Sequence, residues 1–191
     1  MSCAIVVHGA ISSGKTRTCL ELSERARAKG IPVGGILSLR VYRDEELIGY
    51  DGLDLASGNT FPLARLRATV DGPDWFVFGS LIYAFSVPGF ERANSILIYS
   101  AQTLSLSSVI FVDEFGRLER VGLGIYPGAL KVAEKLRVGG IAIFACRSDV
   151  VEAVEALMRG KAQVIFRYEP KELEALWCTI LKYINNAELN I

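Results

Sequence analysis

The residues with the clearest chemical potential form a glycine-rich segment close to the amino-terminal end of the sequence. This segment, Gly9-Ala10-Ile11-Ser12-Ser13-Gly14-Lys15-Thr16, satisfies the pattern G-x-x-x-x-G-K-[ST] in full. Glycine permits the backbone angles that turn consecutive N–H groups toward one point, and a following helix adds the positive end of its dipole. The segment therefore predicts a binding site for a triphosphate.

Individual residues of this segment have predicted roles toward a bound nucleotide. The Lys15 ammonium would lie between β- and γ-phosphate oxygens, and the Thr16 hydroxyl would bind Mg²⁺. The backbone amide of Arg17 would face the α-phosphate. The predicted nucleotide-binding residues are Gly9, Ala10, Ile11, Ser12, Ser13, Gly14, Lys15, Thr16 and Arg17.

A pair of acidic residues supplies the second half of a hydrolytic site. Asp113 and Glu114 follow the apolar run 109–112, so they stand at the end of an expected buried strand. Asp113 could hold the Mg²⁺ that Thr16 also touches, usually through a water molecule. Glu114 could orient or deprotonate a water aimed at the γ-phosphorus. The alternative is that both acids only cap a turn after the strand.

The elements around these residues are those that a phosphate-binding segment requires. Residues 3–7 form a continuous apolar run typical of a strand buried on both faces, and residues 14–30 show helical spacing that ends at Gly30. The segment thus lies between an expected strand and an expected helix, which argues against a chance match.

The rest of the chain alternates helices and strands around a β-rich middle. Residues 35–41 and 47–55 predict a hairpin, residues 76–85 a further β-rich run, and residues from about 91 a helix. Later expected elements are a helix from Pro127, a strand over 141–146, a helix with a capping box of Asp149 and Glu152, a strand over 162–166 and a helix from Pro170. We expect an α/β fold in three layers, with a mostly parallel sheet and a β-hairpin insertion at about residues 33–90.

Composition excludes several classes of protein. The chain has 191 residues, of which 51% are hydrophobic and 22% charged, with 21 basic and 21 acidic side chains. These values favour a single globular domain over residues 1–191, and every apolar run is too short to span a membrane. The sequence contains no run of Lys or Arg residues that would indicate nucleic-acid binding. It also has no basic segment followed by an apolar one, the pattern of a secretory signal, which favours a cytoplasmic location. We expect a monomer or a weak homo-oligomer.

The cysteines are too widely spaced for a metal site or a redox pair. In a reducing compartment they are expected to be small buried hydrophobic residues without a disulfide or zinc. They are Cys3, Cys19, Cys146 and Cys178.

Several segments together resemble the small nucleoside-triphosphatase family first named from thermophiles, whose members are also called cancer-related nucleoside-triphosphatases. The resemblance depends on the glycine-rich segment 9–16, Val33-Gly34-Gly35-Ile36, Leu47-Ile48-Gly49-Tyr50-Asp51, Leu55-Ala56-Ser57-Gly58, Phe78-Gly79 and Val112-Asp113-Glu114-Phe115-Gly116-Arg117-Leu118-Glu119. It implies a P-loop fold of the RecA-like kind and Mg²⁺-dependent hydrolysis of ATP, GTP and other triphosphates to diphosphate and phosphate. It also implies that Arg117 belongs to the catalytic residues, with Lys15 and Glu114.

The chain departs from the family pattern at three places. Ser38-Leu39-Arg40-Val41-Tyr42 stands where the family usually has T-P-E-[VI]-R, and Ser80 stands where it often has Lys. The family's N-R after the last strand is missing, with Tyr168-Glu169-Pro170 near that place. Contacts to the base are therefore not carried over from the family.

Other residues could join the site. Arg147 follows the strand 141–146 and should lie on the same edge as Gly9 and Asp113, where it could sense a γ-phosphate. A cation for the transition state could also come from the β-rich middle, whose arginines are Arg40, Arg43, Arg65 and Arg67. The alternative for each of these arginines, and for Arg147, is a solvent-exposed position without a role in the site.

Two further functions remain open from the residues. The first is a kinase for a nucleoside or another small hydroxyl compound, with residues 33–90 as the acceptor pocket. The second is a nucleotide-dependent switch or binding module whose partner is a protein. Glu114 beside Asp113 favours water as the acceptor.

Overall fold

The apolar runs form the strands of one sheet in the computed structural model, which describes residues 1–188. The strands are β1 (Ser2–Gly9), β2 (Val33–Arg43), β3 (Glu46–Asp54), β4 (Thr60–Leu66), β5 (Trp75–Val77), β6 (Tyr83–Ser86), β7 (Val109–Phe115), β8 (Gly140–Arg147) and β9 (Val164–Tyr168). They make a nine-stranded sheet in the order β5-β6-β4-β3-β2-β7-β8-β1-β9.

The sheet is mixed, and the expectation of a mostly parallel sheet is wrong. Strands β2, β7, β8, β1 and β9 pair in parallel, whereas β3, β4, β6 and β5 join the same sheet through antiparallel pairs. Short connections explain this, because a tight turn can only join antiparallel strands. Between β2 and β3 the turn residues Asp44 and Glu45 have positive φ values of 48° and 67°, as a two-residue hairpin turn requires. The β-rich middle therefore extends the main sheet beyond a simple hairpin.

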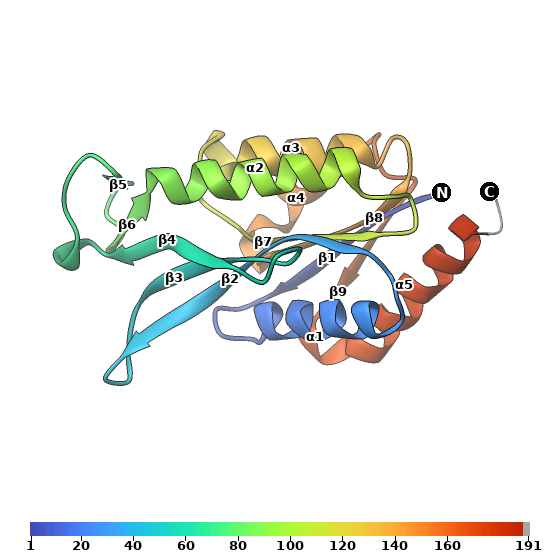
Figure 1. Cartoon of the computed structure of the whole chain (residues 1–191), viewed down its shortest axis with the longest axis horizontal. Helices are drawn as coiled ribbons and strands as arrows, with labels where there is room; N and C mark the ends of the chain where they lie inside the picture. Colours follow the sequence, from blue (N-terminus) through green and yellow to red (C-terminus); the bar gives the residue numbers. More distant parts are fainter. Residues whose placement is uncertain (189–191) are drawn as a thin grey trace.

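Helices cover both faces of the sheet in three layers. They are α1 (Lys15–Ala28), α2 (Val87–Thr103), α3 (Tyr126–Lys135), α4 (Val151–Met158) and α5 (Leu173–Glu188). Figure 1 shows α1 and α5 on one face and α2, α3 and α4 on the other. Each face packs against its own cluster of buried side chains, one including Phe144 and Leu97, the other Phe111 and Leu22. Strands β1 and β8 are buried on both faces, which explains their continuous apolar sequences.

Two helix starts differ from the sequence expectation. Helix α2 begins at Val87 rather than near residue 91, because the Ser86 hydroxyl accepts a hydrogen bond from the Gly89 N–H at 3.1 Å and caps the helix there. The capping box expected at Asp149 and Glu152 does not form, since the Asp149 carboxylate pairs with Arg147 instead.

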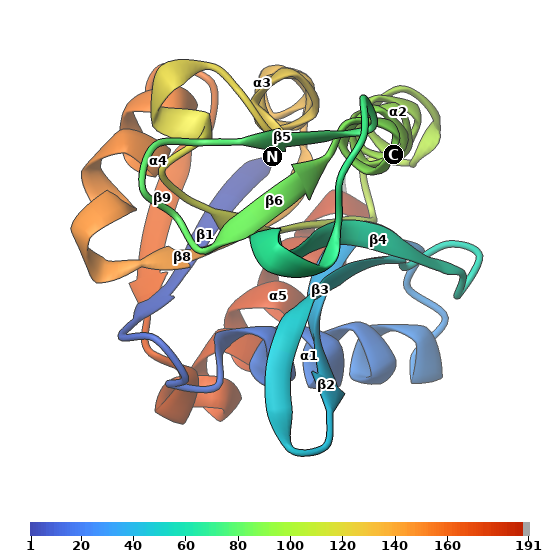
Figure 2. The ribbon, with the colours of Figure 1, turned by 90° about the vertical axis from the view of Figure 1, so that its left-hand side faces the viewer.

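The ends of the parallel strands bring separate segments of sequence to one edge. Gly9 at the end of β1 pairs in register with Arg147 at the end of β8. Ile36 in β2 pairs with Val112 in β7, so Ser38 and Asp113 follow at neighbouring positions. Figure 2 views the molecule from the β5–β6 side and shows the β2–β3 hairpin extending past α1. This edge carries the residues to which the sequence assigns chemistry.

The burial of the cysteines differs from the sequence expectation at one position. Cys3, Cys19 and Cys146 are buried, but Cys178 is exposed on α5, so the expectation of a buried residue is wrong there.

Over residues 1–188, no helix combines the length and apolar character that crossing a membrane would require.

Candidate active site

The loop between β1 and α1 has the backbone shape of an anion site. Ser12 and Gly14 adopt left-handed conformations with φ values of 65° and 96°, and α1 begins directly at Lys15. Such alternation turns successive N–H groups inward, and the start of the helix adds positive potential. We call residues Gly9–Thr16 the phosphate loop.

Lys15 is folded onto this loop. Its side chain lies almost entirely inside the protein, with 6% of the residue exposed. The ammonium donates hydrogen bonds to the carbonyl oxygens of Gly9 at 3.2 Å and Ala10 at 2.8 Å. A buried ammonium needs partners of this kind, so the loop backbone holds the cation at the centre of the phosphate loop.

Asp113 is a buried carboxylate held by backbone groups. Its Oδ2 accepts from the Ser38 N–H at 3.0 Å and its Oδ1 from the Glu114 N–H at 2.9 Å. Burial, followed by the nearby Glu114 carboxylate, raises the pKa of Asp113 to about 7, while hydrogen bonding to Ser38, Thr16 and Glu114 opposes the rise. Asp113 also lines one cavity with Lys15, so the strand β7 acid and the phosphate loop meet.

Glu114 occupies a strained position at a break in the strand pairing. Its φ is 63°, and the register between β7 and β8 shifts between Val112 and Phe115. A bulge of this kind redirects side chains at the end of a strand and is common beside active sites. Consequently, consecutive residues of one strand present a buried acid, Asp113, and an exposed acid, Glu114.

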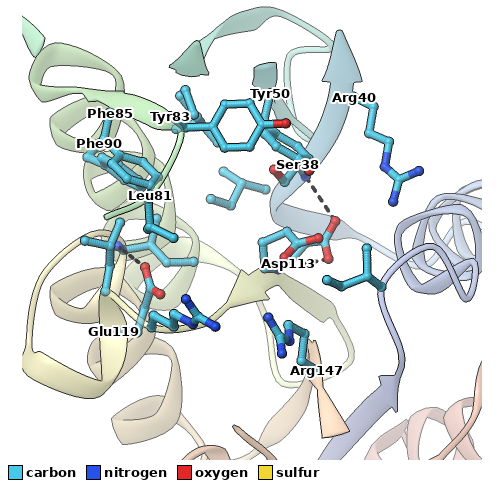
Figure 3. Close-up of a pocket in the computed structure, with 18 of the residues that line it drawn as sticks. Ser38, Arg40, Tyr50, Leu81, Tyr83, Phe85, Phe90, Asp113, Glu119 and Arg147 are labelled. Carbon is cyan, nitrogen blue, oxygen red and sulfur yellow. Dashed lines mark hydrogen bonds between the residues drawn. The ribbon is translucent and has the colours of Figure 1, made fainter. Parts of the chain in front are cut away.

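Two cavities adjoin each other at Glu114, which lines both. The first, which we call the loop cavity, has a volume of about 320 Å³ and is lined by the phosphate loop from Ser12 onward, Arg17, Ser38 and Glu114. The second, the aromatic cavity, has a volume of about 300 Å³ and also reaches Lys15 and Glu114. Figure 3 shows Tyr50, Tyr83, Phe85 and Phe90 around one part of the aromatic cavity, with Asp113 and Arg147 around another.

The structure brings together most of the residues that the sequence singled out. Lys15, Asp113, Glu114, Arg117 and Arg147 all line the aromatic cavity. Thr16, Ser13, Gly14 and Arg17 line the loop cavity with Lys15 and Glu114. The expectation that Arg147 shares an edge with Gly9 and Asp113 is confirmed.

The arginines of the β-rich middle separate into different positions. The Arg40 guanidinium donates a hydrogen bond to the Ser12 hydroxyl at 2.8 Å, so it lies over the phosphate loop. Arg65 instead forms an ion pair with Asp51 at 2.6 Å. Arg40 is therefore the arginine of that group whose contact favours a role at the phosphates.

Sequence reasoning missed several residues of the site. Ser38 lines both cavities, and its position just after the buried run of β2 was the available signal. Tyr50 comes from β3, and no local pattern in the sequence connects it with the phosphate loop. Glu119 is buried, and its carboxylate accepts from the N–H groups of Gly116 at 2.8 Å and Ile125 at 3.0 Å, which fixes the loop that carries Arg117. Burial raises the pKa of Glu119, although these hydrogen bonds oppose the rise.

The oxygen donors at the meeting point suit a small hard cation. The Thr16 hydroxyl and the Asp113 carboxylate are the ligand types that Mg²⁺ takes from a protein when substrate phosphates and water complete its coordination. Among residues 1–185, whose side chains the structure describes, no three His, Cys, Asp or Glu side chains cluster as a metal site. The oxygen donors of Thr16 and Asp113 fit a magnesium ion by their chemistry.

Comparison with known proteins assigns the chain to a family. The model of a family described as NTPase matches residues 4–181. The chain belongs to this NTPase family. Among curated proteins, it is 30% identical over 115 residues to nucleoside-triphosphatase THEP1 of Methanopyrus kandleri, a match that covers 60% of this chain and 58% of that protein. It is 32% identical over 115 residues to nucleoside-triphosphatase THEP1 of Archaeoglobus fulgidus, covering 60% and 61%. The chain thus aligns with about three fifths of each curated relative.

Solved structures show the same fold for this NTPase-family chain. A human cancer-related nucleoside triphosphatase superimposes with a TM-score of 0.68 at 21% identity, over 95% of this chain and 96% of that one. THEP1 from the hyperthermophile Aquifex aeolicus gives a TM-score of 0.67 at 18% identity, over 95% and 98%. At this identity, the likeness establishes the fold and not the activity.

Proposed function

We propose that the chain is a Mg²⁺-dependent nucleoside-triphosphatase that hydrolyses ATP, GTP and other triphosphates to diphosphate and phosphate with little base selectivity. The observation that carries the proposal is that Lys15 of the phosphate loop and the distant acids Asp113 and Glu114 line one cavity. Family membership and the names of the curated relatives support the same activity.

Phosphate binding and orientation come from the loop. Its N–H groups would hold the phosphates, and the Lys15 ammonium would neutralise charge between the β- and γ-phosphates. Thr16 and Asp113 would hold Mg²⁺, which supplies positive charge to the phosphate oxygens when it is bound. Because these groups recognise phosphates rather than the base, we expect the protein to select little among the bases of its substrates.

Water activation is the proposed role of Glu114. Its exposed carboxylate lines both cavities, so it would stand between the bound phosphates and the space from which a water would attack. There it would accept the proton of the attacking water as the bond to the γ-phosphorus forms. Arg117, Arg147 and Arg40 would stabilise the charge of the transferred group.

The wider setting of the protein is part of the same proposal. Strand β8 lies between β1 and β7, which carry the phosphate loop and the acids. We take this arrangement as a RecA-like version of the P-loop fold. We also propose that the protein is cytoplasmic, has no nucleic-acid partner and is a monomer or a weak homo-oligomer.

Phosphate release from ATP, GTP, CTP and UTP, with and without Mg²⁺, tests the proposal. We expect release from all four nucleotides only when Mg²⁺ is present, and loss of release in Lys15→Ala. Lys29→Ala is the matched control, because Lys29 is exposed just after α1. Release that is unchanged in Lys15→Ala, or equal without Mg²⁺, would contradict the proposal.

A further inference from the structure

The aromatic cavity is larger and more apolar than an attacking water requires. Its volume is about 300 Å³, whereas a water molecule takes about 30 Å³ of liquid. Its apolar lining consists of Ile11, Ile36, Leu63, Ala64, Leu81, Phe85, Phe90, Leu118 and Ile125, together with the rings of Tyr50 and Tyr83. A largely apolar cavity with a few converging polar groups is typical of a site for a small organic molecule.

The aromatic rings form one wall of the cavity and pack against one another. Tyr50 and Tyr83 contact edge to face with ring centroids 5.4 Å apart, and Phe85 and Phe90 lie 6.0 Å apart. These rings come from β3, β6 and α2, and each is only half-buried. Burial raises the pKa of the Tyr50 phenol to about 12, so its hydroxyl is neutral and can both donate and accept a hydrogen bond. A planar ring would find both stacking surfaces and a polar contact here.

The position of this cavity relative to the nucleotide follows from the residues that the two cavities share. Lys15 and Glu114 line both, whereas Arg17 and Leu20 line only the loop cavity. In a phosphate loop the α-phosphate faces the Arg17 side and Lys15 reaches the β- and γ-phosphates. The terminal phosphate of a bound nucleotide would therefore point toward the aromatic cavity.

We propose that the aromatic cavity binds a small ring-bearing alcohol of the nucleoside type, and that its primary hydroxyl accepts the γ-phosphoryl group in place of water. This inference rests on the proposed function, because it uses the same phosphate loop and acids. Glu114 lies at the border of the two cavities, where a hydroxyl held in the aromatic cavity meets the γ-phosphate.

The transfer step balances without any further reactant. The hydroxyl oxygen forms a bond to the γ-phosphorus, and the bond from that phosphorus to the oxygen bridging to the β-phosphate breaks. The hydroxyl proton passes to the Glu114 carboxylate. The products are a nucleoside diphosphate and a phosphomonoester. When no alcohol occupies the aromatic cavity, water accepts the γ-phosphoryl group and free phosphate forms. We expect this hydrolysis to be slower than transfer to the alcohol.

The test measures the fate of the γ-phosphoryl group in the full chain with Mg²⁺ and ATP. Adenosine, guanosine, cytidine and uridine are added separately at millimolar concentration, with 5′-deoxyadenosine as the matched compound that lacks the primary hydroxyl. Phosphorus NMR then quantifies ADP, free phosphate and phosphomonoester. We expect at least one nucleoside to give a 5′-monophosphate and to reduce the free phosphate formed per ADP, whereas 5′-deoxyadenosine gives no such product.

Each outcome separates the inference from the proposed function. Free phosphate that equals ADP with every nucleoside overturns the inference and leaves the hydrolase standing. ADP that forms only when a nucleoside is present supports the acceptor site and contradicts the hydrolase. No ADP under any condition overturns both.

A pair of variants links the product to this cavity. Leu81 is half-buried in the loop before β6 and lines the cavity, so Leu81→Trp should fill it. The neighbouring Ile82 is 64% exposed and does not line the cavity, so Ile82→Trp is the matched control. The ratio of phosphomonoester to free phosphate should fall by about tenfold or more in Leu81→Trp and hold in Ile82→Trp. Tyr83→Leu, which removes a ring without adding bulk, should lower the same ratio. An unchanged ratio in both cavity variants overturns the inference.

Discussion

The Asp113 carboxylate accepts a hydrogen bond from the backbone N–H of Ser38 at 3.0 Å. Backbone pairing of β2 with β7 ends at the register pair Ile36 and Val112, so this bond continues the contact between the strands through a side chain. With a second bond from the Glu114 N–H, both carboxylate oxygens are fixed. Asp113 is thereby held at the place where the phosphate loop meets the sheet edge, as its proposed role as a metal ligand requires.

Glu114→Gln should separate binding from turnover. The amide keeps the size and position of the side chain but cannot take a proton from water. We expect phosphate release to fall by about 10² or more, with nucleotide affinity nearly unchanged. Retention of most of the activity would remove Glu114 from the mechanism.

The positive φ of Glu114 predicts a reversed order of stability. At ordinary positions Gly is less stable than Ala, but at φ 63° Ala carries the cost of the left-handed region. Glu114→Gly should therefore be more stable than Glu114→Ala, by about 1 kcal/mol in the free energy of unfolding. Urea denaturation of both variants measures this difference. If Glu114→Ala is the more stable, the residue is not strained.

Gly35 should tolerate no side chain. Its φ is 93°, and a Cβ there would overlap the backbone of Phe111 in the neighbouring strand β7. We expect Gly35→Ala to lower the free energy of unfolding by about 3 kcal/mol or more, because φ strain and a backbone clash combine. Gly58→Ala is the control, since its φ is 75° but a Cβ there meets open space. Gly58→Ala should lower the free energy of unfolding by about 1 kcal/mol. Equal losses in the two variants would show that the clash is relieved by movement of β7.

The cysteines should differ sharply in reactivity. Burial raises the pKa of Cys3 and of Cys146 to about 12 and the pKa of Cys19 well above its ordinary value, whereas Cys178 is exposed. Because the thiolate is the reactive form, iodoacetamide should modify only Cys178 in the folded protein, even when the pH is raised from 7 to 9. Intact-mass measurement before and after denaturation checks this. Modification of Cys19 in the folded protein would show that α1 opens.

The phosphate loop and the acids could be predicted because their chemistry is encoded in local sequence. The spacing from Gly9 to Thr16 fixes a loop shape, and the acids Asp113 and Glu114 follow a strand whose apolar run is continuous. The layers could also be predicted, since strands without polar alternation must be covered on both faces.

The aromatic cavity and the mixed sheet could not be predicted in this way. Tyr50, Tyr83 and Phe90 lie far apart in the sequence and meet only because β3 and β6 extend the sheet next to α2. The exposure of Cys178 could have been predicted from helical periodicity. The buried face of α5 contains Leu176, Trp177, Ile180 and Ile184, and position 178 lies outside it. The capping box at Asp149 failed because an ion pair with Arg147 competes for the same carboxylate.

The structure of Glu114→Gln bound to Mg²⁺ and ATP tests the central claim most directly, because that variant should bind the nucleotide without consuming it. We expect the phosphates against the N–H groups of the phosphate loop, the Lys15 ammonium on the β- and γ-phosphates and the metal ion between Thr16 and Asp113. A nucleotide bound elsewhere, or a triphosphate in the loop whose metal ion is remote from Asp113, would contradict a single site built from the loop and the acids.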